Sequence, residues 1–256
     1  LFGCAVAQAL SAAGHDVIVV DMQEDALEGL GPDFDGETLT GDGKSADTAY
    51  VLRSPEALAW YANAAITEPM TYGAMHVNLG ADINLSGVAY TGVGEKLPWV
   101  PISTYSGVFD GQNHAIASLY INAALDNQGL FGTLGAGATV QNVSLDGEVT
   151  GKNHVGLLAG TANGNVTLKS CFTSGAVRGS DSAGSLLGGH YDNTNNLQVD
   201  SCSNTATVRS GITGSADNRA SGGLVGAVNT AGFTNSSNRG SVAGGVNMFS
   251  GGFVGA

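Results

Sequence analysis

Short runs of alternating apolar and polar residues fill the second half of the chain. Three of them span residues 139–143, 165–169 and 196–200. Successive side chains of an extended strand point to opposite faces, so each run has one apolar and one polar face. Stretches of helical length with a period of about 3.6 residues are absent after residue 70. The pattern therefore predicts a chain built mainly of short β-strands.

A glycine-bounded phrase recurs beside these runs. Its five copies are Gly129–Gly132, Gly156–Gly160, Gly184–Gly188, Gly222–Gly226 and Gly251–Gly255. The intervals between the closing glycines are nearly equal, which is typical of a stacked repeat array. Glycine and asparagine adopt positive φ at low cost, so we expect them at the corners between strands. The interval between Gly188 and Gly226 is longer than the others and predicts a longer loop near Ser210–Asn218.

A second phrase keeps a constant phase with the first. Its four copies are Val143–Val149, Cys171–Val177, Cys202–Val208 and Ser236–Val242, and the first and last residues of each lie six positions apart. An even separation places both ends on the same face of an extended strand. One unit has too little apolar surface to fold alone, whereas units stacked about 4.8 Å apart bury a continuous aliphatic column. We therefore predict a parallel β-helix in which Val143, Cys171 and Cys202 are stacked.

A flexible linker is the main alternative, because 40 of the 256 residues are glycine. A linker would not hold Leu, Val and Phe in register with the glycines, so the β-helix is the better interpretation. Ahead of the repeats, alternation predicts strands at residues 75–79 and 81–85.

A helix is expected at residues 54–64. Ser54 supplies a capping hydroxyl, Pro55 suits the first helical position, and Leu58, Tyr61 and Ala65 would share one face. Such a helix could cover the first rung of the stack, whose strand edges would otherwise be unpaired.

Residues 44–256 resemble GLUG-repeat proteins, which are bacterial surface or secreted proteins. The resemblance rests on an ordered series of motifs: Tyr50-Val-Leu, Ala81-Asp-Ile-Asn-Leu-Ser-Gly, Trp99-Val-Pro-Ile, Gly107-Val-Phe-Asp-Gly, Gly129-Leu-Phe-Gly and the repeated Gly-Gly-Leu-Val-Gly. Related regions occur in large metallopeptidases that cleave immunoglobulin A. The resemblance implies a mainly β fold, a right-handed parallel β-helix outside a bacterial cell, with no activity of its own.

Residues 1–43 differ in composition from the remainder. They hold nine acidic side chains and no Lys or Arg, whereas the whole chain has a net charge of −13. Their pattern predicts helices at residues 3–13 and 22–30, a buried parallel strand at residues 16–21 and a short strand at residues 38–40. This contrast predicts a domain boundary near Gly43.

This first segment resembles the N-terminal, NAD-binding RCK domain of potassium-uptake regulators. Leu1-Phe-Gly, Gly14-His-Asp-Val-Ile-Val-Val-Asp and Gly41-Asp-Gly carry the resemblance. It implies that Gly3 packs the first helix on the sheet and that Asp21 holds the ribose hydroxyls. The first strand and the G-x-G are absent, so the segment is expected to be a truncated α/β, Rossmann-like fragment. We expect no cofactor, and NAD only if the missing parts were restored.

The ends of the sequence indicate a truncated or chimeric piece of a longer chain. It has no initiator Met, no signal peptide and no apolar run long enough to span a membrane. No membrane insertion is therefore expected.

Candidate catalytic and metal-binding residues are few. The histidines at 15, 76, 114, 154 and 190 form no H-E-x-x-H motif, and corner positions are the simplest interpretation of His154 and His190. Asp146, Glu148, Asp181 and Asp200 are spaced one coil apart and are interpreted as solvated turn acids rather than paired catalytic carboxylates. We predict no catalytic residues and no metal site.

The cysteines at 171 and 202 occupy equivalent places in successive repeats. Rung spacing would permit a disulfide, but two buried thiols are the preferred interpretation.

The sequence as a whole favours a non-enzymatic, surface-exposed or secreted module, a stalk or adhesin-like segment of a larger bacterial protein. One alternative is an NAD-binding regulator of potassium uptake, which would be cytoplasmic, and another is a polysaccharide-active β-helix enzyme. Outward Asn, Thr, Ser and Asp residues suit a glycan or a host protein surface as partner. The net charge of −13 makes nucleic acid an unsuitable partner.

Overall fold

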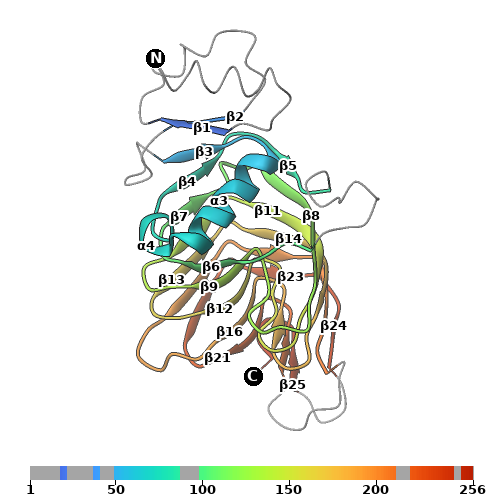
Figure 1. Ribbon diagram of the computed structural model, residues 1–256. Helices are drawn as coiled ribbons and strands as arrows, with labels where there is room; N and C mark the ends of the chain where they lie inside the picture. Colours follow the sequence, from blue (N-terminus) through green and yellow to red (C-terminus); the bar gives the residue numbers. More distant parts are fainter. Residues whose placement is uncertain are drawn as a thin grey trace.

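The computed structural model describes residues 49–86, 98–211, 220–244 and 249–255, together with the backbone of residues 18–21 and 37–40. Within these ranges every strand pairing is parallel, and the strands form stacks that run along one axis (Figure 1). The chain is therefore a parallel β-solenoid, as the repeat pattern predicts. Strand pairing alone leaves the right-handed sense of coiling a prediction.

Three long sheets form the faces of the solenoid. The seven-stranded sheet contains β3 (Tyr50–Leu52), β4 (Val77–Leu79), β7 (Val108–Asp110), β10 (Thr139–Gln141), β13 (Val166–Lys169), β17 (Leu197–Asp200) and β22 (Ala231–Thr234). The eight-stranded sheet contains β5 (Ile83–Asn84), β8 (Ala115–Asn122), β11 (Ser144–Thr150), β14 (Phe172–Arg178), β18 (Ser203–Asn204), β19 (Thr207–Arg209), β23 (Ser237–Asn238) and β24 (Val242–Ala243). The five-stranded sheet contains β6 (Ile102–Tyr105), β9 (Phe131–Leu134), β12 (Ala159–Ala162), β16 (Leu187–His190) and β21 (Val225–Val228).

Two smaller sheets complete the described strands. One contains β15 (Ala183–Gly184), β20 (Ala220–Gly222) and β25 (Phe249–Gly251), and the other pairs β1 (Ile18–Asp21) with β2 (Glu37–Thr40). The pair β1–β2 lies at the same end of the stack as β3 (Figure 1).

Equivalent residues of successive coils are stacked, as predicted. Pairing of Ser144 with Phe172, and of Phe172 with Ser203, puts the preceding residues Val143, Cys171 and Cys202 in one column. All three are buried. A second column joins Val149, Val177, Val208 and Val242. The apolar positions of the repeat thus form continuous columns inside the solenoid.

The stacked cysteines are buried thiols. The Cys171 amide donates to Cys202 Sγ at 3.5 Å, and each thiol donates to a backbone carbonyl at 3.3 Å, that of Lys169 for Cys171 and that of Asp200 for Cys202. The contact with Cys202 and burial raise the pKa of the Cys171 thiol. We expect neither thiol to react while the protein is folded.

Most of the repeated glycines serve close backbone contact rather than positive φ. None of the phrase glycines has a positive φ. A Cβ on Gly188 would lie 2.3 Å from the backbone of His154 and Val155, and one on Gly160 would lie 2.3 Å from Asn127. Each of these glycines lets a neighbouring coil cross directly over it, which no other residue would allow.

Positive φ occurs at several corners, one of which lies between the seven- and eight-stranded sheets. Asn142, Ser170, Ser201 and Asn235 occupy equivalent positions there, with φ of 52°, 51°, 54° and 50°. The prediction of glycine and asparagine at positive-φ corners is therefore confirmed for asparagine and for Gly137 and Gly164, whose φ values are 87° and 78°, and wrong for the phrase glycines.

The predicted helix is present as α3 (Pro55–Thr67). Ser54 Oγ accepts from the Ala57 amide, and Leu58, Tyr61 and Ala65 are fully buried. The helix ends three residues later than predicted and is followed by α4 (Pro69–Tyr72). It packs against β6, the edge strand of the five-stranded sheet (Figure 1). It therefore covers the edge of the five-stranded sheet, whereas the seven-stranded sheet continues past it to β3 and β4.

The acidic N-terminal segment is described at two strands. β1 and β2 confirm the parallel strands predicted at residues 16–21 and 38–40. Asp21 is the last residue of β1. Gly3, the two expected helices and the boundary near Gly43 lie outside the described residues, so the domain division stays a prediction.

The irregular interval is divided between two places. Ala162 pairs with His190, and Val166 pairs with Leu197. Val166 lies four residues after Ala162, whereas Leu197 lies seven residues after His190. Three extra residues therefore lie between His190 and Leu197. Arg178 pairs with Arg209, and Ala183 pairs with Ser221. Ala183 lies five residues after Arg178, whereas Ser221 lies twelve residues after Arg209. Seven more extra residues therefore lie between Arg209 and Ser221. The prediction of one loop near Ser210–Asn218 is therefore incomplete. Residues 212–219 themselves lie outside the described residues.

Candidate binding groove

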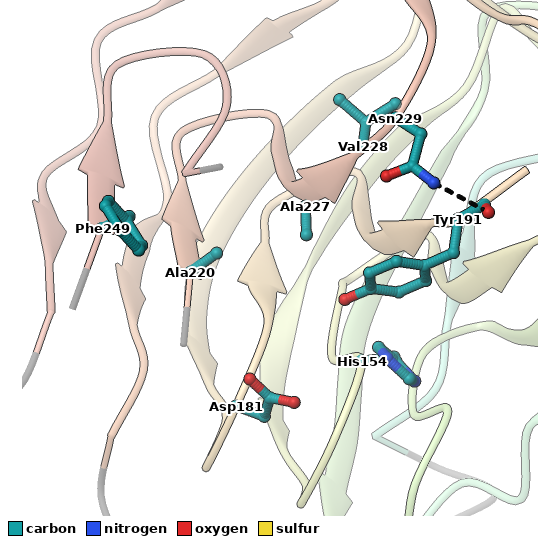
Figure 2. A pocket seen from close by; sticks show the side chains of 8 residues that line it. All are labelled: His154, Asp181, Tyr191, Ala220, Ala227, Val228, Asn229 and Phe249. Carbon is teal, nitrogen blue, oxygen red and sulfur yellow. Dashed lines mark hydrogen bonds between the residues drawn. The ribbon is translucent and has the colours of Figure 1, made fainter. Parts of the chain in front are cut away.

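A groove of about 550 Å³ lies where the repeat becomes irregular. It is lined by His154, Asp181, Tyr191, Ala220, Ala227, Val228, Asn229 and Phe249. Figure 2 shows the rings of Tyr191 and His154 on one side and Phe249 on the other. These residues come from four successive coils, so the groove runs across the rungs of the solenoid.

One wall is a layer of side chains from successive coils. The pairings between coils put four residues in one column: His154, Ser182, Ala220 and Phe249. Three of them line the groove, and Ser182 is buried. His154 has a φ of 56°, which confirms its predicted corner position. Its Nδ1 lies 3.2 Å from Asn127 Oδ1 of the preceding coil, so the imidazole donates from that nitrogen.

Tyr191 lies beside His154 on one side of the groove. Its ring meets that of His154 edge-on, with the centroids 5.0 Å apart, and its hydroxyl lies 2.8 Å from Ser182 Oγ. The ring lies over Gly189, where a Cβ would come within 2.5 Å of it. Gly189 therefore makes room for the ring, and Tyr191 is 45% exposed.

The groove begins where an outward threonine column ends. Thr104, Thr133 and Thr161 are stacked on β6, β9 and β12, and the next two members of the column are Gly189 and Ala227. Glycine and alanine lack the branched side chain of threonine, so the outer surface of β16 and β21 is recessed. The recess is the floor of the groove.

The three extra residues of the irregular coil build the loop that carries Tyr191. In this loop Asp192 Oδ1 accepts from the amides of Thr194 and Asn195, at 2.8 and 3.1 Å. The Asn195 side chain also donates to Asp192 Oδ2, at 2.7 Å. This bond, together with those from the two amides, holds the pKa of the Asp192 carboxyl well below its usual range. Asn229 of the next coil donates to Tyr191 O at 2.9 Å (dashed in Figure 2) and to Asn193 Oδ1 at 2.8 Å.

The charge of the groove is modest. None of the described lining residues is Lys or Arg, and Asp181 is their one carboxylate. Burial lowers the pKa of His154, although Asp181 and Asp126 act in the opposite direction. Burial also raises the pKa of Tyr191. At neutral pH the two rings are therefore uncharged.

Two predicted positions need correction. His190 is a core residue and not a corner: it is fully buried in the inward column of Tyr105, Leu134, Ala162 and Val228, and its Nε2 donates to Gly164 O at 3.0 Å. Asp181 is half-buried rather than a solvated turn acid, because it lies in the wall of the groove.

The other candidate acids lie on different faces. Asp146 and Glu148 are exposed on β11, and Asp200 ends β17 in another sheet. Asp146 accepts from Ser174 and Asp200 from Ser201. Across the described part of the chain, no group of three or more His, Cys, Asp or Glu residues could hold a metal ion.

Tyr191, Asn229 and Phe249 were not distinguished by their sequence context. The long glycine interval was the available signal, because an interruption of a repeat is where an extra loop must leave the stack. The long interval does not by itself predict a groove, because a groove forms only if the extra loop folds back over the outer surface of the coils.

Comparisons with known proteins find limited similarity. No family model matches the chain. A stretch of 119 residues, 43% of the chain, is 37% identical to halomucin from Haloquadratum walsbyi, of which it covers 1%. A solved chain described as a proposed immunoglobulin A1 protease from Bacteroides ovatus is 15% identical, with a TM-score of 0.41 and 77% of each chain covered.

These findings support neither of the two families that the sequence resembles. The chain spans a very small part of the curated relative that it matches. In the described ranges, no helix is both long and apolar enough to cross a membrane.

Proposed function

We propose that the chain is a non-enzymatic solenoid segment of a larger cell-surface or secreted protein. The observation that carries the proposal is the uninterrupted parallel stacking of coils from β3 to β22, with continuous inward columns. Such an array is stabilised by contacts between neighbouring coils and presents long side surfaces. The similarity to halomucin supports a segment of a larger protein, because the chain corresponds to 1% of that relative.

The exposed positions support a role in contact with polar partners. Outward residues of β11 and β14 include serine, threonine and acidic side chains, and the net charge is −13. These groups suit glycans or a protein surface outside the cell, and they disfavour nucleic acid and anionic membranes.

Location is tested by proteolysis of intact cells that produce the protein. An antibody against the chain should lose its signal when whole cells are treated with a protease, while a cytosolic marker stays intact. Protection of the chain until the cells are lysed would contradict an external location.

The two alternative functions have separate tests. Calorimetry with NADH should give no signal, whereas micromolar binding that Asp21→Ala abolishes would favour the potassium-uptake regulator. Incubation with acidic polysaccharides should release no new reducing ends. Their release would favour an enzyme.

A further inference from the structure

Beyond this structural role, we propose that the groove at Tyr191 binds a short, neutral saccharide chain. The groove is a concave site of about 550 Å³ with aromatic, apolar and hydrogen-bonding groups, the combination typical of sites for small organic ligands. The inference depends on the groove alone and not on the location of the protein.

The length of the groove suits a linear ligand. His154, Ser182, Ala220 and Phe249 follow one another over three steps between coils. At a strand spacing of about 4.8 Å these steps span about 14 Å. This distance accommodates a short oligosaccharide that lies along the solenoid axis.

Two aromatic rings can contact the apolar faces of sugar rings. Tyr191 is 45% exposed and Phe249 is 62% exposed, and they lie on opposite sides of the groove (Figure 2). The Tyr191 ring is held in place by His154, by the hydroxyl of Ser182 and by the Asn229 bond to its carbonyl. A ring that is already fixed loses little conformational freedom when a ligand stacks on it.

Hydrogen-bonding groups also line the groove. The Asp181 carboxylate and Asn229 Oδ1 can accept from sugar hydroxyls, whereas the Asn229 amide hydrogens are donated to Tyr191 O and Asn193 Oδ1. Ala220, Ala227 and Val228 supply an apolar floor.

The charge of the groove favours a neutral ligand. Acidic saccharides are opposed by the net charge of −13 and by the lack of Lys and Arg among the described lining residues. Asp181 is the one carboxylate among the described lining residues, so the groove offers little charge to a cationic ligand.

The strand pairing disfavours an extended peptide. Peptides commonly bind by pairing with an exposed strand edge. β20 lies between β15 and β25, and β16 lies between β12 and β21, so these two strands have no open edge, whereas β21 and β25 end their sheets. The groove presents side chains on sheet faces, which suits a ligand that is recognised by hydroxyls and ring faces.

Titration calorimetry with trisaccharides of glucose, mannose, galactose and xylose tests the proposal. At least one is expected to bind with a Kd between about 10 μM and 1 mM. Tyr191→Ala and Phe249→Ala should each weaken that binding by about tenfold or more. Asp181→Asn should also weaken it, whereas Tyr191→Phe should weaken it less than Tyr191→Ala, because it keeps the ring and loses only the hydroxyl contact with Ser182.

Leu125→Ala and Val100→Ala are the matched controls. Their side chains are 63% and 64% exposed, like that of Phe249, and neither lines the groove. Both should bind as the unchanged protein does. Circular dichroism and the thermal midpoint of each variant show whether the solenoid is intact.

Three results would overturn the proposal. One is the absence of binding by all four trisaccharides at about 10 mM, the weak limit of specific recognition. Another is binding that the groove substitutions leave unchanged. The third is tighter binding of spermidine or of a neutral hexapeptide at the same groove.

Discussion

The regular coils between β9 and β14 and the irregular coil that contains β16 use the same repeat differently. In the regular coils every position has an equivalent in the next coil, so inward side chains fill the columns and outward threonines stack. The irregular coil keeps the inward columns but replaces the outward threonine with Gly189 and adds a loop after His190. The core tolerates no interruption, whereas the outer surface can change without disturbing the stack.

This difference separates stability from recognition. Coil stacking buries the columns that hold the solenoid together. The groove arises where an outward column is missing and a side loop supplies new groups. Changes to the stack should therefore cost much more stability than changes to the loop.

The largest effect is expected from Gly188→Ala. Its new Cβ would lie 2.3 Å from the backbone of His154 and Val155, and backbone cannot move aside cheaply. We expect a loss of about 3 kcal/mol or more in the free energy of unfolding, measured by urea denaturation. Gly252→Ala is the control, because Gly252 has nothing within 4 Å of a new Cβ. Equal stability of the two variants would contradict the close-crossing role of the phrase glycines.

A somewhat smaller effect is expected from a regular column. Leu168 is fully buried and is stacked between Val140 and Val199. Leu168→Ala should reduce the free energy of unfolding by about 3 kcal/mol, within the range for buried leucines. Its neighbour Thr167 points outward, and Thr167→Ala should change stability by about 0.5 kcal/mol or less. A large loss in the threonine variant would show that the outer face also holds the stack.

Deleting Asp192–Thr194 should reduce the free energy of unfolding by much less, about 1 kcal/mol. The deletion shortens a side loop and restores the regular offset between coils. Calorimetric unfolding should show one cooperative transition, and the groove should lose the wall that holds Tyr191. Removing Thr167–Lys169 instead takes the same number of residues from a strand, and that variant should not fold. If the loop deletion unfolds the protein, the loop is part of the stack and the comparison fails.

The smallest effect is the contribution of His154 to the pH dependence of the free energy of unfolding. Burial lowers its folded pKa, so the unfolded chain, with a value near 6.5, binds a proton first as the pH falls. The free energy of unfolding should therefore decrease from about pH 6.5 down through the folded pKa. His154→Asn places in this coil the residue found at the equivalent corner of the preceding one, Asn127, whose φ is 55°. That variant should show a shallower slope between pH 6.5 and 5 in pH-dependent denaturation. An unchanged slope would assign the dependence to other groups.

Thiol labelling checks the stacked cysteines. Cys171 and Cys202 should both react after unfolding and neither before it, because each is buried in the column. Absence of free thiols at these positions after unfolding would show that a disulfide links them.

Periodicity in the sequence was enough to predict the solenoid, the stacked columns and the helix α3. A repeat constrains structure strongly, since each coil must present the same apolar positions to its neighbours. Ser54 and Pro55 locate the start of the helix through local rules alone. The role of the glycines was only half predicted, because Gly188 is needed for contact with His154 and Val155, which lie more than one coil earlier in the sequence.

The sequence by itself therefore determined the repeating part of the protein. It determined the strands, which of their side chains point inward, and the presence of an interruption between Gly188 and Gly226. Only the tertiary structure decided that three of the extra residues form a loop after His190. It also decided that the Tyr191 ring lies over Gly189 and that His190 points into the core. The physical reason is the range of the interactions. Strand facing follows from neighbouring residues, whereas the groove depends on side chains from four coils that meet only once the solenoid is stacked.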